Sequence, residues 1–238
     1  MQRPEFPIEP DRAILVGGFA RPEDLQMARL ADAQAACDVV EIRLDLIFES
    51  PASVAPESWA HLAAAPLLFT ARRASEGGHG QWGAAARMEM LERALHDAAA
   101  VDVEVASIPE MNDLLAQIRN EGLPWIASYH DFEKMPHSNV LHDQLSRAAD
   151  AGASIFKVAT WLHSIDDMVR LAEFQMREHP LPVASMGMGP LAAVSRLLCA
   201  QCGSKLSYGY LGSTATAPGQ WSAHLLREAI SKLPLIAP

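Results

Sequence analysis

The sequence predicts an α/β fold, a single (β/α)8 TIM barrel with parallel strands, on three observations. From residue 13 onward, short apolar stretches of strand length alternate eight times with longer amphipathic stretches. The starts of successive strands lie roughly 20–30 residues apart, which suits βα units and leaves no room for an added domain. The chain has 238 residues, a length that such barrels commonly fill as one unit. An open, doubly wound sheet is the alternative, because eight strands do not by themselves require closure.

The apolar stretches define the expected strands, and the amphipathic stretches define the expected helices. The strands cover residues 13–18, 39–45, 66–72, 101–105, 125–131, 154–160, 182–188 and 205–211. The helices cover residues 22–36, 53–63, 84–99, 109–121, 138–150, 165–177, 190–202 and 219–231, the second having the weakest pattern. Pro22 and Pro109 stand at first helical positions, and Gly122, Gly152 and Gly203 stand where helices should end. We expect one catalytic domain over residues 1–238, with residues 1–12 as an N-terminal arm.

Composition argues against several classes of function. The net charge is −10 without any Lys/Arg-rich segment, so we expect no nucleic-acid or membrane partner. No apolar run approaches the length of a membrane span, and the Pro-rich N-terminus does not resemble a signal sequence, so a cytoplasmic protein is expected. Cys37, Cys199 and Cys202 give no disulfide framework and are expected to be reduced and structural. No histidine pair shows a recognised metal-ligand spacing, so no metal site is predicted.

Gly78, Gly80 and Gly83 form a G-x-G-x-x-G pattern between a strand and a helix. A dinucleotide-binding turn must follow its strand immediately so that the pyrophosphate reaches the helix N-terminus. Here residues 73–77 intervene, and Glu76 would face the phosphates. We interpret the segment as a glycine-rich, mobile loop.

Lys157 lies inside the apolar run of residues 154–160 and is one of only four lysines in the chain. Burial should lower its pKa and leave a neutral amine, the form that attacks a carbonyl. The alternative is a lysine whose head reaches water or a carboxylate. His130 ends the preceding strand, so its imidazole should reach the same barrel mouth and exchange protons there. Together they predict imine chemistry, in which the histidine removes the proton next to an iminium and passes it to a leaving hydroxyl.

Further polar residues gather where the strands end, which is where barrels carry their chemistry. They are Glu41, Arg43 and Asp45 on one side of the second strand, Arg72 at the end of the third and Glu76 after it, and Asp102 and Glu104 in the fourth. Inward polar groups are costly unless they pair or bind a ligand. A closed ion network of Glu41, Arg43, Asp45, Arg72 and Glu104 is therefore one interpretation, and a substrate site is the other. Arg196, early in the helix after the seventh strand, could hold a carboxylate or lie at the surface.

Six short motifs occur in order from Val39 to Gln220. They are Glu41-Ile-Arg43-Leu-Asp45, Phe69-Thr-Ala-Arg72 with Glu76-Gly77-Gly78, Ser128-Tyr-His130-Asp131-Phe132, Phe156-Lys157-Val158-Ala159, Met186-Gly-Met188 with Ser195-Arg196-Leu197, and Thr216-Ala-Pro218-Gly219-Gln220. In this order they resemble type I 3-dehydroquinate dehydratase (3-dehydroquinase), a hydro-lyase of the shikimate pathway and of aromatic amino acid biosynthesis. The resemblance implies a (β/α)8 barrel that dehydrates 3-dehydroquinate to 3-dehydroshikimate. It also implies a homodimer without metal or organic cofactor.

The resemblance also implies roles for individual residues. Lys157 matches the Schiff-base lysine, His130 the general acid/base, and Glu76 the group that orients the histidine. The substrate-binding residues that it implies are Arg196 and Gln220 on the carboxylate side, Glu41, Arg43 and Arg72 at the ring hydroxyls, and Met186 and Met188 in the apolar wall. Residues 215–220 match a lid that closes over the substrate.

Three positions depart from the family pattern. Thr216 stands where the lid usually has serine, Tyr208 stands where a phenylalanine is usual, and residues 189–193 replace a more polar stretch. We count Thr216 and Tyr208 among the substrate-binding residues. Two alternatives remain open: another lysine-dependent barrel such as a class I aldolase, and a non-catalytic module that keeps the ligand pocket for regulation.

Overall fold

Eight parallel strands form one sheet in a computed structural model that describes residues 3–7, 12–234 and 236. The strands are β1 Ile14–Phe19, β2 Val39–Arg43, β3 Leu67–Thr70, β4 Ala100–Glu104, β5 Trp125–Asp131, β6 Ile155–Trp161, β7 Val183–Met188 and β8 Leu206–Tyr210. Their order is β7-β6-β5-β4-β3-β2-β1-β8. The strands at the two ends of this order, β7 and β8, come together where the backbone N–H of Lys205 donates to the carbonyl of Val183 at 2.9 Å. The nearly closed barrel confirms the predicted fold, and the doubly wound alternative is wrong.

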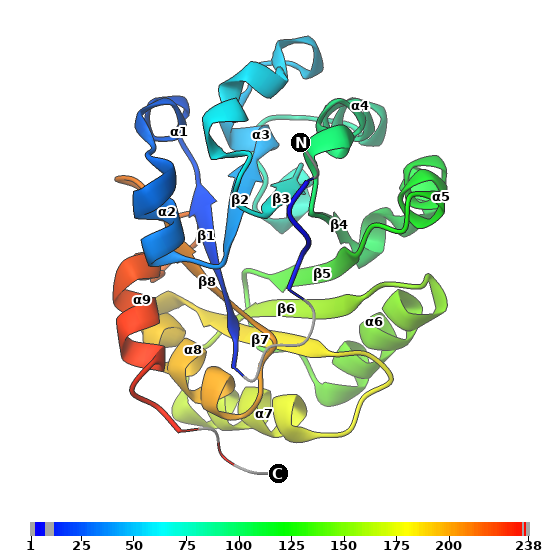
Figure 1. Cartoon of the computed structure of the whole chain (residues 1–238). Helices are drawn as coiled ribbons and strands as arrows, with labels where there is room; N and C mark the ends of the chain where they lie inside the picture. The colour runs from blue at the N-terminus through cyan, green and yellow to red at the C-terminus, as the bar shows by residue number, and fades with distance from the viewer. Residues whose placement is uncertain (1–2, 8–11, 235, 237–238) are drawn as a thin grey trace.

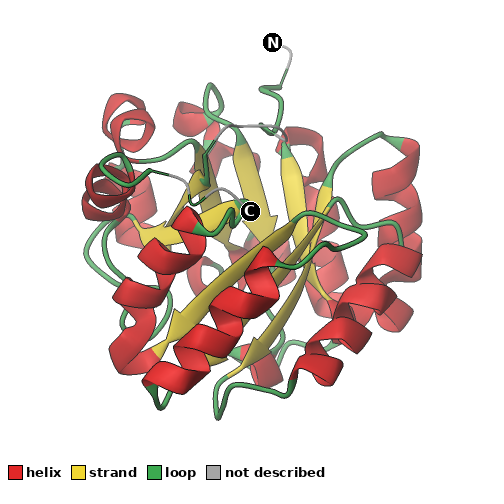
Figure 2. Ribbon diagram, turned by 90° about the horizontal axis from the view of Figure 1, so that it is seen from below, coloured by secondary structure: helices red, strands yellow, loops and turns green. Residues whose placement is uncertain are grey.

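The helices surround the strands on the outside of the barrel (Figures 1 and 2). They are α1 Pro22–Met27, α2 Leu30–Ala36, α3 Leu44–Ile47, α4 Ala84–Ala94, α5 Asn112–Asn120, α6 Ser138–Asp150, α7 Ile165–Met176, α8 Ala192–Gln201 and α9 Ala223–Ile230. Short 3-10 turns extend α4, α5 and α8 to nearly the predicted lengths. The predicted strands match the observed ones within one or two residues at each end.

Three predicted helices differ from the structure. The one predicted at 219–231 begins only at Ala223, because residues 219–222 are not helical. The stretch 22–36 is broken into α1 and α2 because Ala28 adopts an extended backbone conformation, and no proline or glycine marks this break. The stretch 53–63 contains only two 3-10 turns, at residues 56–58 and 60–62, and the last residue of a third that starts at Pro51. Pro56 lacks an N–H and favours an extended Ala55, so a continuous helix cannot form there. Residues 44–45, predicted as the end of the second strand, begin α3 instead.

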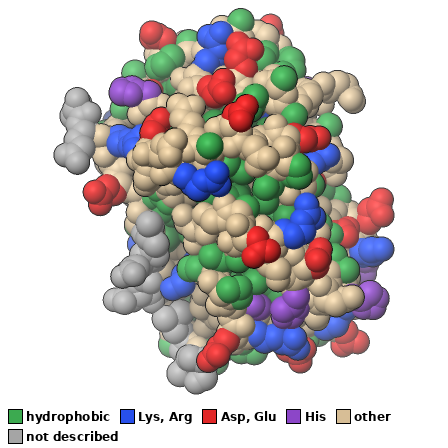
Figure 3. Space-filling view, turned by 90° about the vertical axis from the view of Figure 1, so that its right-hand side faces the viewer, with side chains coloured by type: hydrophobic (Ala, Val, Ile, Leu, Met, Phe, Trp, Pro, Cys, Tyr) green, Lys and Arg blue, Asp and Glu red, His purple; other side chains and the backbone are tan. Residues whose placement is uncertain are grey.

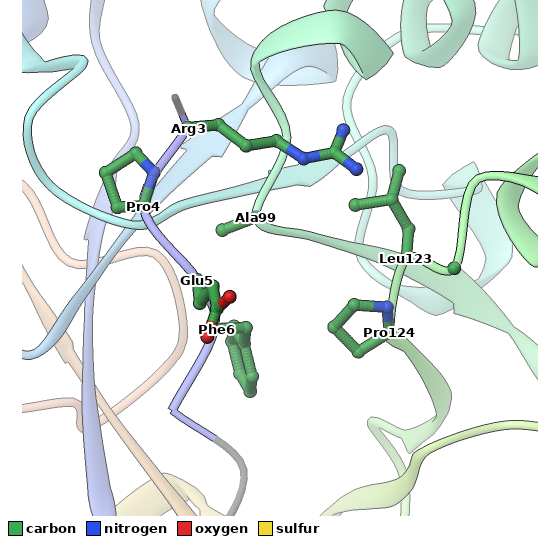
Figure 4. A pocket seen from close by; sticks show the side chains of 8 residues that line it. Arg3, Pro4, Glu5, Phe6, Ala99, Leu123 and Pro124 are labelled. Atoms are coloured by element: carbon green, nitrogen blue, oxygen red, sulfur yellow. The ribbon is translucent and has the colours of Figure 1, made fainter. Parts of the chain in front are cut away.

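Residues 3–7 of the predicted N-terminal arm lie across the end of the barrel where the strands begin (Figure 1). Phe6 is buried with Ile14, Leu68 and other apolar side chains inside the barrel, so this end is filled. Figure 4 shows arm residues 3–6 facing Leu123 and Pro124 across a cavity of about 340 Å³. Residues 1–2 and 8–11 of the predicted arm lie outside the described residues.

The surface shows no gathering of charge on the side seen in Figure 3, where basic and acidic side chains are interspersed. Within the described part of the chain, no helix combines the length and the apolar character needed to cross a bilayer. The remaining question is what the polar groups at the carboxyl ends of the strands do.

Candidate active site

A small cavity of about 50 Å³ lies at the carboxyl ends of the strands, opposite the arm. All twelve residues that the sequence predicts for the site line it: Glu41, Arg43, Arg72, Glu76, His130, Lys157, Met186, Met188, Arg196, Tyr208, Thr216 and Gln220. The structure therefore brings the predicted residues together from five strands, from the segments after β3 and β8, and from α8. Their individual roles stay predictions.

Lys157 stands in the middle of β6 with its side chain directed into the barrel and only 4% of the residue exposed. Its Nζ donates to Oδ2 of Asp102 at 2.6 Å and lies 4.5 Å from the centre of the Tyr208 ring. Burial lowers the pKa of Lys157, although Asp102 acts in the opposite direction. The amine is thus easier to deprotonate than an exposed lysine, and it has a carboxylate beside it.

Asp102 on β4 connects Lys157 to Arg72, which follows β3. Arg72 reaches Oδ1 of Asp102 at 2.9 Å, while Lys157 holds Oδ2. Arg72 also donates to Glu104 at 3.2 Å and to the hydroxyl of Ser128 at 2.5 Å. The ion network proposed from the sequence therefore exists in part, as the pairs Arg72–Glu104 and Arg43–Asp45. It also includes Lys157, which the sequence interpretation had left outside it.

His130 lies two residues beyond Ser128 on β5, and Ser128 is paired in register with Lys157. Residues two apart on a strand share a face, so the imidazole and the amine line the same cavity. Oε2 of Glu76 accepts the backbone N–H of His130 at 3.0 Å, and the ring Nδ1 lies 3.0 Å from the same oxygen. Because that oxygen is an acceptor in both contacts, we assign the ring proton to Nδ1 and leave Nε2 as the free base.

The environment moves the pKa values of this pair in opposite directions. Burial, helped by the charges of Arg72 and Lys157, keeps the pKa of His130 well below its ordinary value, so the ring is neutral at pH 7. Burial raises the pKa of Glu76 to about 7, although Arg72 opposes the change. Gly77 follows Glu76 directly, and its φ of 82° suits glycine; a Cβ at this position would collide with the ring of Phe132.

Arg196 in α8 is 2% exposed and has no carboxylate within 4 Å among the described residues. Its Nη1 donates to the carbonyls of Gly187 at 2.8 Å and Ala192 at 3.1 Å, while Nε has no partner. Burial without a counter-ion lowers the pKa of Arg196 to about 10. The guanidinium is still charged at pH 7, so the cavity wall holds a buried cation that lacks an anion.

The hydroxyl-binding side of the predicted site also has free polar atoms. Glu41 accepts the hydroxyl of Thr70 at 2.8 Å through Oε1, and its Oε2 accepts from no described group. Arg43 is paired with Asp45 at 2.8 Å. The Tyr208 hydroxyl is buried and makes no hydrogen bond within the described part of the chain. Burial raises the pKa of Tyr208 well above its usual value, so this group keeps its proton and can donate.

Thr216, Ala217 and Gln220 of the predicted lid, residues 215–220, line the cavity. The Thr216 backbone N–H and hydroxyl both donate to Oε1 of Gln220 at 2.8 Å, which leaves the Gln220 amide nitrogen available. The Pro218 carbonyl accepts the N–H of Gly189 at 3.2 Å. The backbone N–H of Ser213 donates to Asp24 at 2.9 Å and so fixes the start of the loop to α1.

Several residues that the structure places at the site had received no individual role from the sequence. Gly77, Phe132, Ala159 and Ala217 stand in the quoted motifs and line the cavity. Asp102 touches the lysine amine, although the sequence had given it no role. Its signal was present, because a carboxylate in a strand that is otherwise apolar needs a buried partner.

Comparisons with known proteins agree on one family. Residues 20–234 match the family model described as Type I 3-dehydroquinase. The chain is 36% identical over 220 residues to 3-dehydroquinate dehydratase from Haloquadratum walsbyi, covering 87% of this chain and 89% of that one. It is 31% identical over 227 residues to 3-dehydroquinate dehydratase from Methanococcoides burtonii, covering 94% and 95%. The crystal structure of 3-dehydroquinate dehydratase from Geobacillus kaustophilus superposes with a TM-score of 0.81 at 25% identity, covering 93% and 91%.

Proposed function

This chain belongs to the type I 3-dehydroquinase family, and from that premise we propose that Lys157 and His130 carry out its reaction. The activity is that of a 3-dehydroquinate dehydratase, a hydro-lyase. The observation that supports the proposal is the buried amine of Lys157, which lines the same cavity as a neutral imidazole. A desolvated amine and a free imidazole nitrogen are what an imine-dependent elimination requires.

In the first half of the mechanism, the neutral Lys157 amine attacks the C3 ketone of 3-dehydroquinate. The carbinolamine loses water and becomes an iminium. Nε2 of His130 then removes a proton from C2, and the electron pair of that C–H bond moves into the iminium to give an enamine. The iminium thus acts as the electron sink that a simple ketone would supply less well.

In the second half, the enamine expels the C1 hydroxyl, which leaves as water with the proton that His130 returns. This step forms the C1–C2 double bond and restores the iminium. Hydrolysis then releases 3-dehydroshikimate and the amine. Glu76 keeps the His130 proton on Nδ1 and stabilises the imidazolium that forms between the two proton transfers.

We assign substrate binding from the polar atoms that the protein leaves unpaired. The guanidinium of Arg196 and the amide nitrogen of Gln220 suit the substrate carboxylate. Oε2 of Glu41 suits a ring hydroxyl, with Arg43 and Arg72 shaping the pocket beside it. Met186 and Met188 on β7 form the apolar wall, and Thr216 fixes Gln220 within the lid.

Borohydride reduction in the presence of 3-dehydroquinate, followed by mass spectrometry, tests the assignment. We expect an adduct at Lys157 in the unchanged enzyme, none with Lys157→Ala, and an adduct without turnover with His130→Ala. Lys205→Ala is the matched control, because Lys205 precedes β8 at the opposite end of the barrel and should leave trapping intact. An adduct that persists in Lys157→Ala would refute the assignment.

Product analysis separates the alternatives that the sequence left open. Dehydration creates a conjugated enone that absorbs in the ultraviolet, whereas an aldolase would release two smaller carbonyl compounds. A regulatory binding module would bind 3-dehydroquinate and form no enone. We also propose that the enzyme is a homodimer, which light scattering across a range of concentrations would test.

A further inference from the structure

Asp102 occupies the centre of the buried charge network. The residue is 1% exposed, and its two oxygens contact different cations, Lys157 at 2.6 Å and Arg72 at 2.9 Å. Ser128 donates a third hydrogen bond to it at 2.5 Å. If its charge were removed, the two cations would lose the anion between them, and the charge of Arg72 already acts to lower the pKa of Lys157.

The surroundings of the Lys157 nitrogen favour a positive charge at that atom. The Asp102 carboxylate lies at hydrogen-bond distance, and the face of the Tyr208 ring lies 4.5 Å away, where the π electrons attract a cation. Burial has the opposite effect and favours a neutral nitrogen. Burial alone would be enough to keep the amine neutral. We therefore expect the carboxylate and the ring to stabilise a positively charged state of the nitrogen during the reaction.

That state follows from the reaction. When the amine condenses with a ketone, one water leaves, and the product nitrogen keeps one hydrogen and a positive charge. The hydrogen must have an acceptor inside the closed cavity. The same nitrogen loses its charge when the C2–H electrons form the double bond of the enamine and the C=N π electrons move onto nitrogen. It regains the charge when the hydroxyl leaves. A fixed anion beside it therefore stabilises the two charged states that precede and follow the elimination.

We propose that Asp102 is the counter-ion of the Lys157 iminium and accepts its N–H, an inference that rests on the proposed Schiff-base function. Asp102 is a catalytic residue in this role because it contacts the reacting nitrogen. It is not the base that removes protons, since Arg72 and Lys157, acting against burial, lower the pKa of Asp102 to about 2. A carboxylate that stays ionised at every working pH is suited to hold a charge and poorly suited to take a proton.

Among the described carboxylates, only Asp102 lies within 4 Å of the Lys157 nitrogen. Glu104, two residues along β4, is equally buried, but its oxygens bind Arg72, Arg87 and the hydroxyl of Ser107. It makes no contact with Nζ of Lys157. Glu104→Gln is therefore a matched control, since it removes one buried negative charge from the same strand without touching the nitrogen.

The test compares Asp102→Asn with Glu104→Gln. Borohydride reduces a protonated iminium much faster than a neutral imine, so the yield of trapped adduct reports the charge on the nitrogen. With 3-dehydroquinate at saturation, we expect the unchanged enzyme and Glu104→Gln to give a level yield between pH 6 and 9. Asp102→Asn should give adduct at pH 6. Above the lowered pKa of its imine, its yield of adduct should fall about tenfold per pH unit. Its kcat/KM at pH 7.5 should fall by about 100-fold or more.

Each outcome decides the question. A level yield for Asp102→Asn, or the same loss with pH in Glu104→Gln, would overturn the counter-ion role while leaving the Schiff base intact. Absence of any adduct in the unchanged enzyme would instead overturn the proposed function and this inference with it. If Asp102→Asn does not fold, Asp102→Glu keeps the charge at a shifted position and should retain a level yield at a lower rate; a yield that falls with pH in that variant contradicts the proposal.

Discussion

Glu76 is predicted to lower the stability of the protein at neutral and alkaline pH, so Glu76→Gln should raise it. The carboxyl is 8% exposed, and burial raises its pKa from 4.5 to about 7. A group with a higher pKa in the folded state binds more protons there than in the unfolded chain. Its contribution therefore favours folding at low pH and is lost as the pH rises through about 7. Glutamine is uncharged at every pH and can accept the same two hydrogen bonds from His130 through its carbonyl oxygen.

The magnitude follows from the two pKa values. The cost of ionising the buried carboxyl is roughly 3 kcal/mol at pH 8 and under about 1 kcal/mol at pH 5, taking about 1.4 kcal/mol per pH unit between the folded and unfolded values. For a chain of this size, 3 kcal/mol corresponds to an increase in Tm of about 6–12 °C. The gain in Tm should thus be large at pH 8 and small at pH 5.

Thermal unfolding of both proteins between pH 5 and pH 8 checks this expectation. The same substitution at Glu104 is the control, because that carboxylate is paired with Arg72 and Arg87, and its loss should lower Tm by breaking buried ion pairs. Glu76→Gln should also have a reduced kcat, and it should lack the fall in kcat below about pH 7 that we expect of the unchanged enzyme. A Tm for Glu76→Gln equal to or below that of the unchanged protein at pH 8 would refute the assigned pKa.

Three further substitutions test the other features of the site. Arg196→Gln should raise KM for 3-dehydroquinate by about 10- to 100-fold with a smaller effect on kcat, because a charge-assisted hydrogen bond to the substrate carboxylate is lost. Steady-state kinetics check this, and an unchanged KM contradicts the assignment of Arg196 to the carboxylate. Tyr208→Phe removes a buried hydroxyl without a described partner, so Tm should stay level or rise by an amount corresponding to about 1 kcal/mol, while KM rises severalfold if the hydroxyl meets the substrate. Gly77→Ala should lower the unfolding free energy by about 1–3 kcal/mol and slow turnover, because the φ of 82° and the nearby Phe132 ring exclude a side chain at this position. Denaturant titration measures the loss, and an unchanged unfolding free energy would show that the loop adapts to the side chain.

The sequence was most informative where one local rule decided the outcome. The β5 strand and the α6 helix lie where the apolar alternation and the helical periodicity predict them, at residues 125–131 and 138–150. The stretch 53–63 failed because its weak periodicity was given more weight than Pro56, which prevents a continuous helix. The break of the helix at Ala28 has no local signal and depends on the tertiary structure.

Within the site, the sequence predicted which residues gather but not how they are partnered. Alternation along a strand places Lys157 and His130 on the cavity side. The contact between Lys157 and Asp102 joins side chains from two strands that are not adjacent, β4 and β6, and depends on the curvature of the barrel and on rotamers. No pattern within one strand encodes such a contact, so Asp102 was recognised as polar without receiving a role.

The pairing of charges bears on the choice between an ion network and a substrate site that the sequence left open. Arg43, Arg72 and Lys157 each have a carboxylate within 4 Å, and these pairs hold the cavity wall in shape. Arg196 has no such partner among the described residues, and one oxygen of Glu41 accepts no hydrogen bond from them. A buried cation without an anion and a buried carboxylate oxygen without a donor are both unfavourable in the resting protein. A ligand with a carboxylate and hydroxyl groups would satisfy both, so we propose that the network and the binding site are two parts of one arrangement, in which the paired charges support the unpaired groups that would bind the substrate.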